Sequence, residues 1–296
     1  MSEIERILNA KEKKVEQKSL ISSFFKKIKK FLGINFPKLY KIKIELKKKN
    51  TFSGWGMNTQ GTYPPWNNLS LAENKNFSIA HTELLDLLKQ NKFHLTQFFY
   101  KDADYKKIIE ELQWRHYIVF NSVLYAINFS ESDKINIVEC GVCDGLTAHF
   151  AMKACEYKNS FFTAYLYDTW AKLNSTDEDL RFKYAYLNIE TTKLNLQQFS
   201  KNTIYNKGLI PDLFVSVKNP DKINWLHIDL NSSVATLKAL EFFYDKIEHN
   251  GVILFDDYGG FEETRKVIDN FFKNKKGNFL NLPTGQGVFY KSIKKD

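Results

Sequence analysis

From residue 135 onward, short apolar runs rich in β-branched and aromatic residues alternate with helical stretches, and this alternation limits the fold more than any other feature of the chain. The runs cover residues 135–141, 161–168, 203–208, 223–230 and 251–258. Strands that alternate with helices form a parallel sheet that is covered on both faces. Two further runs follow, joined by residues 283–287; because this connection is too short for a crossover, they predict an antiparallel hairpin at one end of the sheet. The expected fold class is therefore α/β, with a Rossmann-like, mostly parallel sheet of seven strands.

The first part of the chain has a different character and predicts an N-terminal helical and irregular extension. Residues 1–50 hold 15 Lys or Arg against 5 Asp or Glu, a balance of +10 in a chain whose total is +9, so the remainder is nearly neutral. Residues 52–68 are rich in Gly, Pro and Trp and predict irregular backbone, which either connects along an edge of the core or forms a lid over a pocket. We expect three regions: a basic arm (1–50), a cap or lid (51–130) and the main domain (131–296).

Within the arm, residues 20–33 place apolar side chains at helical spacing with lysines between them. Such a helix either lies on an anionic membrane surface or packs its apolar stripe on the body of the protein or on a second subunit, as in a homo-oligomer. No apolar run reaches the roughly 20 residues that span a bilayer, and the N-terminus is charged where a secretory signal would be apolar. We expect a cytoplasmic protein, located at the inner membrane face if the arm binds lipid.

Cys140 and Cys143 form a C-x-x-C, the spacing of a zinc half-site or of a redox pair. A zinc site needs two more ligands, and the six histidines do not lie at ligand spacing from this pair, which leaves Cys155 alone. A redox pair stays open, but we favour a small buried side chain on the strand for Cys140. Three cysteines within sixteen positions are not a disulfide framework, which fits a reducing compartment.

The same segment also has the spacing of a nucleotide-binding turn, through Glu139, Gly141 and Gly145. This E-x-G-x-x-x-G closes the first predicted strand: Gly141 permits a tight turn, and Gly145 lets a ligand approach the backbone near the helix N-terminus. Asp168 closes the second strand, 23 residues beyond Gly145, where a carboxylate can accept hydrogen bonds from the hydroxyls of a ribose. Because the turn is not G-x-G-x-x-G and no Gly-Lys-Ser/Thr follows, it favours a nucleoside without a phosphate chain over a dinucleotide.

Acidic residues follow two neighbouring strands of the predicted sheet, in the sequences HID (227–229) and DDY (256–258). We expect Asp229, Asp256 and Asp257 to converge, because the carboxyl ends of parallel strands share one edge. Three ionised carboxylates need a cation beside them, and oxygen ligands suit Mg²⁺. The alternative is that an aspartate caps each following helix and the third is solvated. His227 is either a proton acceptor or a satisfied strand histidine.

These residues resemble those of a known family. The segments NIVECGVCDGLTA, YLYDTW, NWLHIDLNSSVATLKALEFFYDKIEHNGVILFDDYGG and VIDNFF are together similar to macrocin (TylF)-type O-methyltransferases, which modify sugars and have the class I S-adenosylmethionine-dependent methyltransferase fold. The resemblance covers residues 110–292, and its most specific part is the HID and DDYG pair. The closing LPTGQGVFYK is similar to relatives encoded with surface-polysaccharide and glycan genes.

The resemblance implies transfer of a methyl group from S-adenosylmethionine to a hydroxyl of a sugar, nucleotide-sugar or glycan. It implies that the metal, Mg²⁺, is held by Asp229, Asp256 and Asp257, and that Asp229 or His227 takes the proton. The residues that it implies for cofactor binding are Glu139, Gly141, Val142, Gly145, Thr147 and Asp168.

The chain departs from the family at Asn231, where a second acid is usual, and at Cys143 and Asp144 in the turn. A cofactor-binding or scaffold protein without turnover therefore stays open as an alternative. An NAD-dependent oxidoreductase is disfavoured by the turn sequence. A nucleic-acid partner is not expected, because the basic charge is confined to the arm.

Overall fold

The computed structural model describes residues 75–96, 109, 112–171, 184 and 186–292, which all belong to one compact unit, Gly54–Asp296. The basic arm with its helix at 20–33 and the Gly- and Trp-rich segment at 52–68 lie outside the described residues, and so does most of the region 51–130. The division into arm, cap and main domain therefore stays a prediction.

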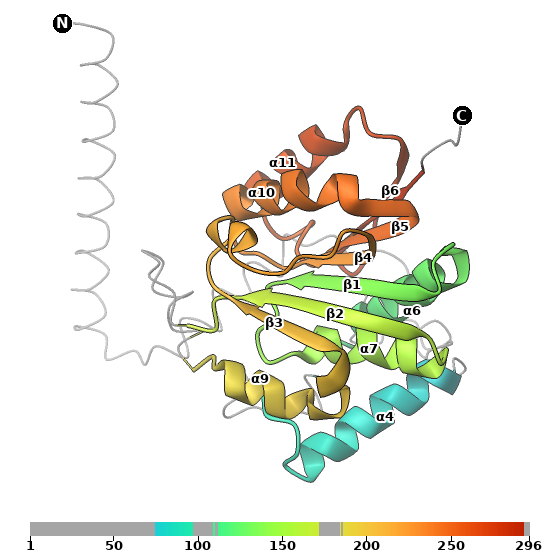
Figure 1. Ribbon diagram of the computed structural model, residues 1–296, viewed down its shortest axis with the longest axis vertical. Coiled ribbons are helices and arrows are strands. Elements are labelled where there is room, and N and C mark those ends of the chain that lie inside the picture. The colour runs from blue at the N-terminus through green and yellow to red at the C-terminus, as the bar shows by residue number, and fades with distance from the viewer. Residues whose placement is uncertain (1–74, 97–108, 110–111, 172–183, 185, 293–296) are drawn as a thin grey trace, which may run out of the picture. The chain divides into compact units, whose positions relative to one another are not determined.

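The described chain forms a seven-stranded sheet in the order β3-β2-β1-β4-β5-β7-β6. The first five strands are parallel, and β7 runs antiparallel between β5 and β6. This confirms the predicted Rossmann-like sheet and its C-terminal hairpin (Figure 1). The strands are β1 (Lys134–Cys140), β2 (Phe161–Asp168), β3 (Thr203–Lys207), β4 (Ile223–Ile228), β5 (Ile247–Phe255), β6 (Gly277–Asn281) and β7 (Gly287–Lys291).

Helices cover both faces of the sheet (Figure 1). They are α4 (Lys75–Lys89), α6 (Gln113–Phe129), α7 (Leu146–Tyr157), α9 (Ile189–Asn195), α10 (Ser233–Phe243) and α11 (Glu262–Phe272). Short 3₁₀ turns are η2 (Gln197–Asn202), η3 (Asp212–Val215) and η4 (Tyr244–Lys246). None of the helices in the described part of the chain combines the length and the apolar character that crossing a bilayer needs.

The two-residue period of the strands divides the core into two layers. On β1, Ile137 packs in the layer formed with α4, α6 and α7, whereas its neighbour Val138 packs in the layer formed with α10 and α11. Successive side chains of a strand point to opposite faces, and a strand buried on both faces is apolar throughout. The strand β4, with the sequence INWLHI, is buried at every position. Because a buried polar group is costly without a hydrogen bond, its one histidine, His227, needs a partner in the core.

Candidate functional site

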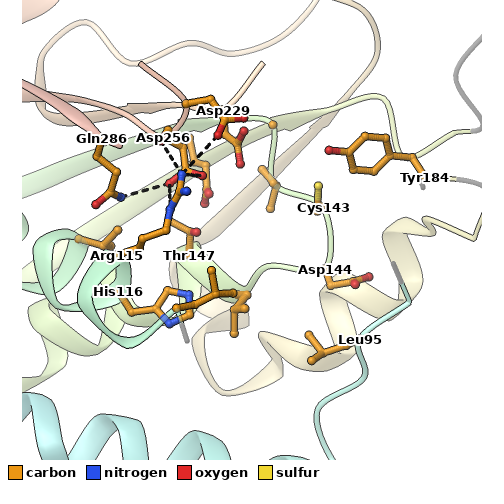
Figure 2. A pocket seen from close by; sticks show the side chains of 17 residues that line it. Leu95, Arg115, His116, Cys143, Asp144, Thr147, Tyr184, Asp229, Asp256 and Gln286 are labelled. Atoms are coloured by element: carbon orange, nitrogen blue, oxygen red, sulfur yellow. Dashed lines mark hydrogen bonds and ion pairs between the residues drawn. The ribbon is translucent and has the colours of Figure 1, made fainter. Parts of the chain in front are cut away.

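The site lies where the order of the strands reverses. The strands β1 and β4 are neighbours, but the helices that follow them, α7 and α10, pack on opposite faces of the sheet. In open α/β sheets this arrangement leaves a crevice beyond the carboxyl ends of the two strands. A cavity of about 210 Å³ lies here, lined by residues from α6, the turn after β1, the ends of β4 and β5, and the β6–β7 connection (Figure 2).

The glycine turn and the aspartates predicted from sequence meet in this one cavity. Its lining includes Glu139, Gly141, Val142 and Thr147 from β1, the turn and α7, and Asp229, Asp256 and Asp257 from the ends of β4 and β5. Two more predicted residues, Gly145 and Asp168, are not among the lining residues.

Gly141 is required by the geometry of the turn. Its φ is +89°, a conformation that L residues rarely adopt, and a Cβ built on it would stand 2.0 Å from the backbone carbonyl oxygen of Asp229. Gly145 also has a positive φ, but a Cβ there would meet the side chain of Leu196 at 2.9 Å. The space beside Gly145 is filled by the end of α9. This glycine therefore permits α9 to pack closely against the turn.

Asp168 holds the turn in place. One of its carboxylate oxygens accepts hydrogen bonds from the backbone N–H groups of Val142 and Cys143, at 2.7 and 2.8 Å. The other accepts from the backbone N–H of Trp170 at 2.8 Å. Through these hydrogen bonds Asp168 orders the two loops after β1 and β2.

The aspartates converge as the sequence predicts. Oxygen atoms of Asp229, Asp256 and Asp257 lie within 4.8 Å of one another, a separation suited to a metal ion. The helix-capping alternative is wrong for these residues, because Ser232 caps α10 by accepting a hydrogen bond from Ala235 and the N-cap position of α11 is Phe261.

Arg115 already provides a cation for this cluster. Its guanidinium group reaches from α6 and forms an ion pair with Asp256, with Nε 3.2 Å from Oδ1 and the terminal nitrogen bonded to Oδ2. The same nitrogen lies 3.5 Å from Oδ1 of Asp257 and donates to the backbone carbonyl of Asp256. Sequence reasoning missed Arg115, since a single arginine in an apolar helical stretch carries no signal of what it will pair with.

Glu139 and His227 form a buried pair beside the aspartates. They face each other across β1 and β4, with Nδ1 of His227 3.1 Å from Oε1 of Glu139, while Nε2 lies 3.9 Å from Oδ1 of Asp256. Burial by itself lowers the pKa of His227, but the flanking carboxylates of Asp256 and Glu139 outweigh it and raise this pKa to about 10. The two carboxylates therefore favour the protonated form of His227.

The carboxyl groups of the cluster differ in acidity. Burial, together with the charges of Asp256 and Asp257, raises the pKa of Asp229 well above its ordinary value. Burial would raise the pKa of Asp256 too, yet Arg115 and His227 hold it well below the ordinary value. Asp256 is thus the ionised anchor of the cluster, and Asp229 takes up a proton more readily than Asp256.

Two more contacts involve residues that sequence reasoning did not assign to the site. Gln286, fully buried in the β6–β7 connection, donates from Nε2 to Oδ1 of Asp256 at 3.1 Å (Figure 2). Asn231, at the position where macrocin-type enzymes usually have an acid, donates from its side-chain amide to the hydroxyl of Tyr184 at 2.9 Å. Tyr184 lines the cavity at the end that also holds Cys143 (Figure 2).

The cysteines do not form a reactive pair. Cys140 is fully buried on β1, as predicted, and burial raises the pKa of its thiol well above the ordinary value. A thiol in such surroundings is a poor nucleophile and metal ligand. Cys143 lies in the turn and lines the cavity.

Comparison with known proteins agrees with this geometry. Residues 138–258 match the model of a family described as a methyltransferase domain, and no match was found among curated proteins. The solved structure of the O-methyltransferase NovP is similar with a TM-score of 0.54 and 15% identity, over 60% of this chain and 80% of that chain.

Two other solved structures are more distant. The calicheamicin methyltransferase CalS11 has a TM-score of 0.44 at 14% identity, over 83% of this chain and 100% of that chain. The SAH-bound methyltransferase PaMTH1 of Podospora anserina has a TM-score of 0.42 at 10% identity, over 88% of this chain and 97% of that chain.

The fold that this chain shares with NovP is the one predicted from its strands. The match to the family model runs from β1 to the turn after β5, the part of the chain that holds the glycine turn, Asp168 and the aspartate cluster. These comparisons support a methyltransferase: the chain has a Rossmann-like fold, and residues 138–258 match a methyltransferase-domain model.

Proposed function

We propose that this protein is an S-adenosylmethionine-dependent O-methyltransferase that acts on a hydroxyl group of a sugar, nucleotide-sugar or glycan, in the synthesis of a surface polysaccharide or glycoconjugate. The observation that carries the proposal is the single cavity in which the glycine turn after β1 faces Asp229, Asp256 and Asp257. One side suits a nucleoside-bearing methyl donor, and the other suits an acceptor rich in oxygen. The sugar assignment rests on the resemblance of the HID and DDYG segments to macrocin-type enzymes.

The turn side of the cavity fits the cofactor. The second carboxylate oxygen of Glu139, Oε2, is buried and has no hydrogen-bond partner among the residues that the structure describes. A buried carboxylate oxygen without a donor is costly, so a ligand N–H or O–H group is expected to bind there. S-adenosylmethionine, when bound, supplies a methyl group on a positively charged sulfur. Glu139, Val142 and Thr147 would hold it against the turn that Gly141 shapes.

The donor set of the aspartate side fits a hard divalent cation, because all its ligands are oxygens. Asp229, Asp256 and Asp257 would hold Mg²⁺, which would lower the pKa of the acceptor hydroxyl when bound. Metal dependence is part of the proposal, and chelation tests it separately from methyl transfer.

Asp229 is better suited than His227 to take the proton of the acceptor. His227 directs Nδ1 at Glu139, and the neighbouring carboxylates favour its protonated form, which makes it a poor acceptor for another proton. Asp229 lines the cavity and has a raised pKa, which matches the requirement for a general base. The proposed role of His227 is to hold Glu139 and Asp256 in place.

A mass-shift assay tests the proposal. The full-length protein is incubated with S-adenosylmethionine, Mg²⁺ and a panel of nucleotide-sugars and oligosaccharides, and each product is examined for the mass of one added methyl group. Transfer to a sugar hydroxyl supports the proposal. Cofactor binding by calorimetry without transfer to any acceptor would instead favour the scaffold alternative, and transfer that is unchanged in chelator would remove the metal from it.

A further inference from the structure

Arg115 supplies a positive charge to the aspartate cluster. The cluster member that it holds most firmly is Asp256. Both side-chain oxygens of Asp256 are engaged: Oδ1 accepts from Nε of Arg115 at 3.2 Å and from Gln286 at 3.1 Å, and Oδ2 forms the ion pair with Arg115. Nε2 of His227 stands 3.9 Å from the same Oδ1. An ion that used Asp256 as a ligand would need an oxygen that already has protein donors.

A divalent ion and this guanidinium group compete for the same place. Mg²⁺ bonds to carboxylate oxygens at about 2.0–2.1 Å and demands near-ideal octahedral geometry. The terminal nitrogen of Arg115 is bonded to Asp256 and lies 3.5 Å from Asp257, so it occupies the space between two of the three prospective ligands. Two like charges in that space would repel each other strongly, because the site is partly shielded from water.

The side chain of Arg115 is only partly buried, so it is the mobile partner of the ion pair with Asp256. This side chain is 24% exposed, whereas His227 is fully buried and its ring cannot leave the core. A partly exposed arginine side chain can change its rotamer at lower cost than a fully buried histidine ring.

We propose that the guanidinium group of Arg115 is the resident cation of the aspartate cluster, and that a divalent ion binds to Asp229, Asp256 and Asp257 only by displacing it. The inference rests on the proposed function only in taking this cluster as the ion site. Arg115 is then a positioning residue that holds Asp256 and Asp257 together before the ion arrives. Because the ion must displace it, Arg115 weakens the apparent affinity for the ion.

The test measures ion binding directly, without cofactor or acceptor. Mn²⁺, which replaces Mg²⁺ at oxygen sites, is titrated into the full-length protein, and free Mn²⁺ is followed by electron paramagnetic resonance. Arg115→Gln removes the competing charge and should bind Mn²⁺ about tenfold more tightly than the wild type, the factor expected when a hydrogen bond between charged groups no longer has to be broken. Arg265→Gln, the same change at an exposed position on α11, should bind Mn²⁺ as the wild type does.

Arg115→Lys is the second variant, and it keeps the proposal testable if Arg115→Gln does not fold. Lysine retains the charge but cannot form the two-pronged contact with Asp256, so Mn²⁺ binding should be tighter than in the wild type and weaker than in Arg115→Gln. The proposal is overturned if neither variant binds Mn²⁺ more tightly than the wild type, or if no form of the protein binds Mn²⁺. Neither result bears on methyl transfer, which the mass-shift assay measures separately.

Discussion

A Cβ on Gly141 would stand 2.0 Å from the backbone carbonyl oxygen of Asp229, so the turn after β1 and the strand end that begins the aspartate cluster are in direct contact. The backbone N–H of Asp229 also donates to the carbonyl of Cys140 at 2.8 Å. The two halves of the site, which are almost ninety residues apart in the sequence, are therefore built as one rigid unit at the switch point. A change in the turn should therefore shift the position of Asp229.

Gly141→Ala should destabilise the protein far more than an alanine at another glycine with positive φ. Gly285 is the matched control, since its φ is +84° and a Cβ there would meet nothing within 4 Å. Gly285→Ala should cost only the backbone strain of about 1–2 kcal/mol. Gly141→Ala adds a clash with backbone and should cost about 4 kcal/mol or more. Urea unfolding measures both, and equal losses would show that the contact with Asp229 relaxes easily.

Asp168→Asn should loosen the turn. An asparagine has one acceptor oxygen where Asp168 uses two, and its NH₂ group would face backbone N–H donors such as that of Val142 or Trp170. We expect a loss of about 1–3 kcal/mol in the free energy of unfolding and weaker binding of S-adenosylhomocysteine by calorimetry. Asp212→Asn, on the surface in η3, is the control and should change neither. A variant with wild-type stability and reduced cofactor binding would mean that Asp168 turns to contact the ligand.

Asp257→Ala should abolish methyl transfer and leave the affinity for the cofactor nearly unchanged. We propose that Asp257 lies on the acceptor side of the cavity, where it is paired with Arg115 at 3.5 Å. Loss of a group that stabilises the reacting charge lowers the rate constant of transfer by at least about a hundredfold. The rate is followed by the mass shift of the acceptor, and the affinity by calorimetry with S-adenosylhomocysteine. Loss of cofactor binding would place Asp257 in the other half of the site.

Stability should fall in acid because of His149, which is buried in the core layer formed with α4, α6 and α7. His149 is fully buried between the rings of Phe93, Phe150 and Phe199, and burial, with a smaller effect of Lys153, lowers its pKa to about 3. The unfolded chain takes up this proton near pH 6.5 and the folded chain only near pH 3, so the stability contributed by the neutral ring is complete above pH 6.5 and is lost as the pH falls toward 3.

His149→Phe removes this titration and keeps the ring packing. Between pH 6.5 and 3 the variant should lose less stability than the wild type, by up to about 4 kcal/mol at the acid end. Urea midpoints across this range measure the difference. Parallel curves for the two proteins would show that His149 does not titrate with folding.

Local patterns in the sequence predicted most of the fold. The run FFTAYLYD is β2 as expected, and the connection at 283–287 does join an antiparallel hairpin, because strand period and turn length are properties of a few neighbouring residues. The same reasoning placed Asp229, Asp256 and Asp257 at one edge of the sheet. Three carboxylates at one place predict a cation beside them, but strand ends alone do not indicate which group supplies it.

The sequence by itself thus determined the sheet, its switch point and the set of acidic residues that gather there. Only the tertiary structure decided that Arg115 supplies the charge and that Asp168 is engaged by the turn. The physical reason is distance along the chain: Arg115 and Asp256 are separated by 141 residues and meet because α6 packs beside the end of β5. Hydrophobic periodicity fixes where a helix begins and which face it buries, but the partner of a single polar side chain depends on how all the elements finally pack.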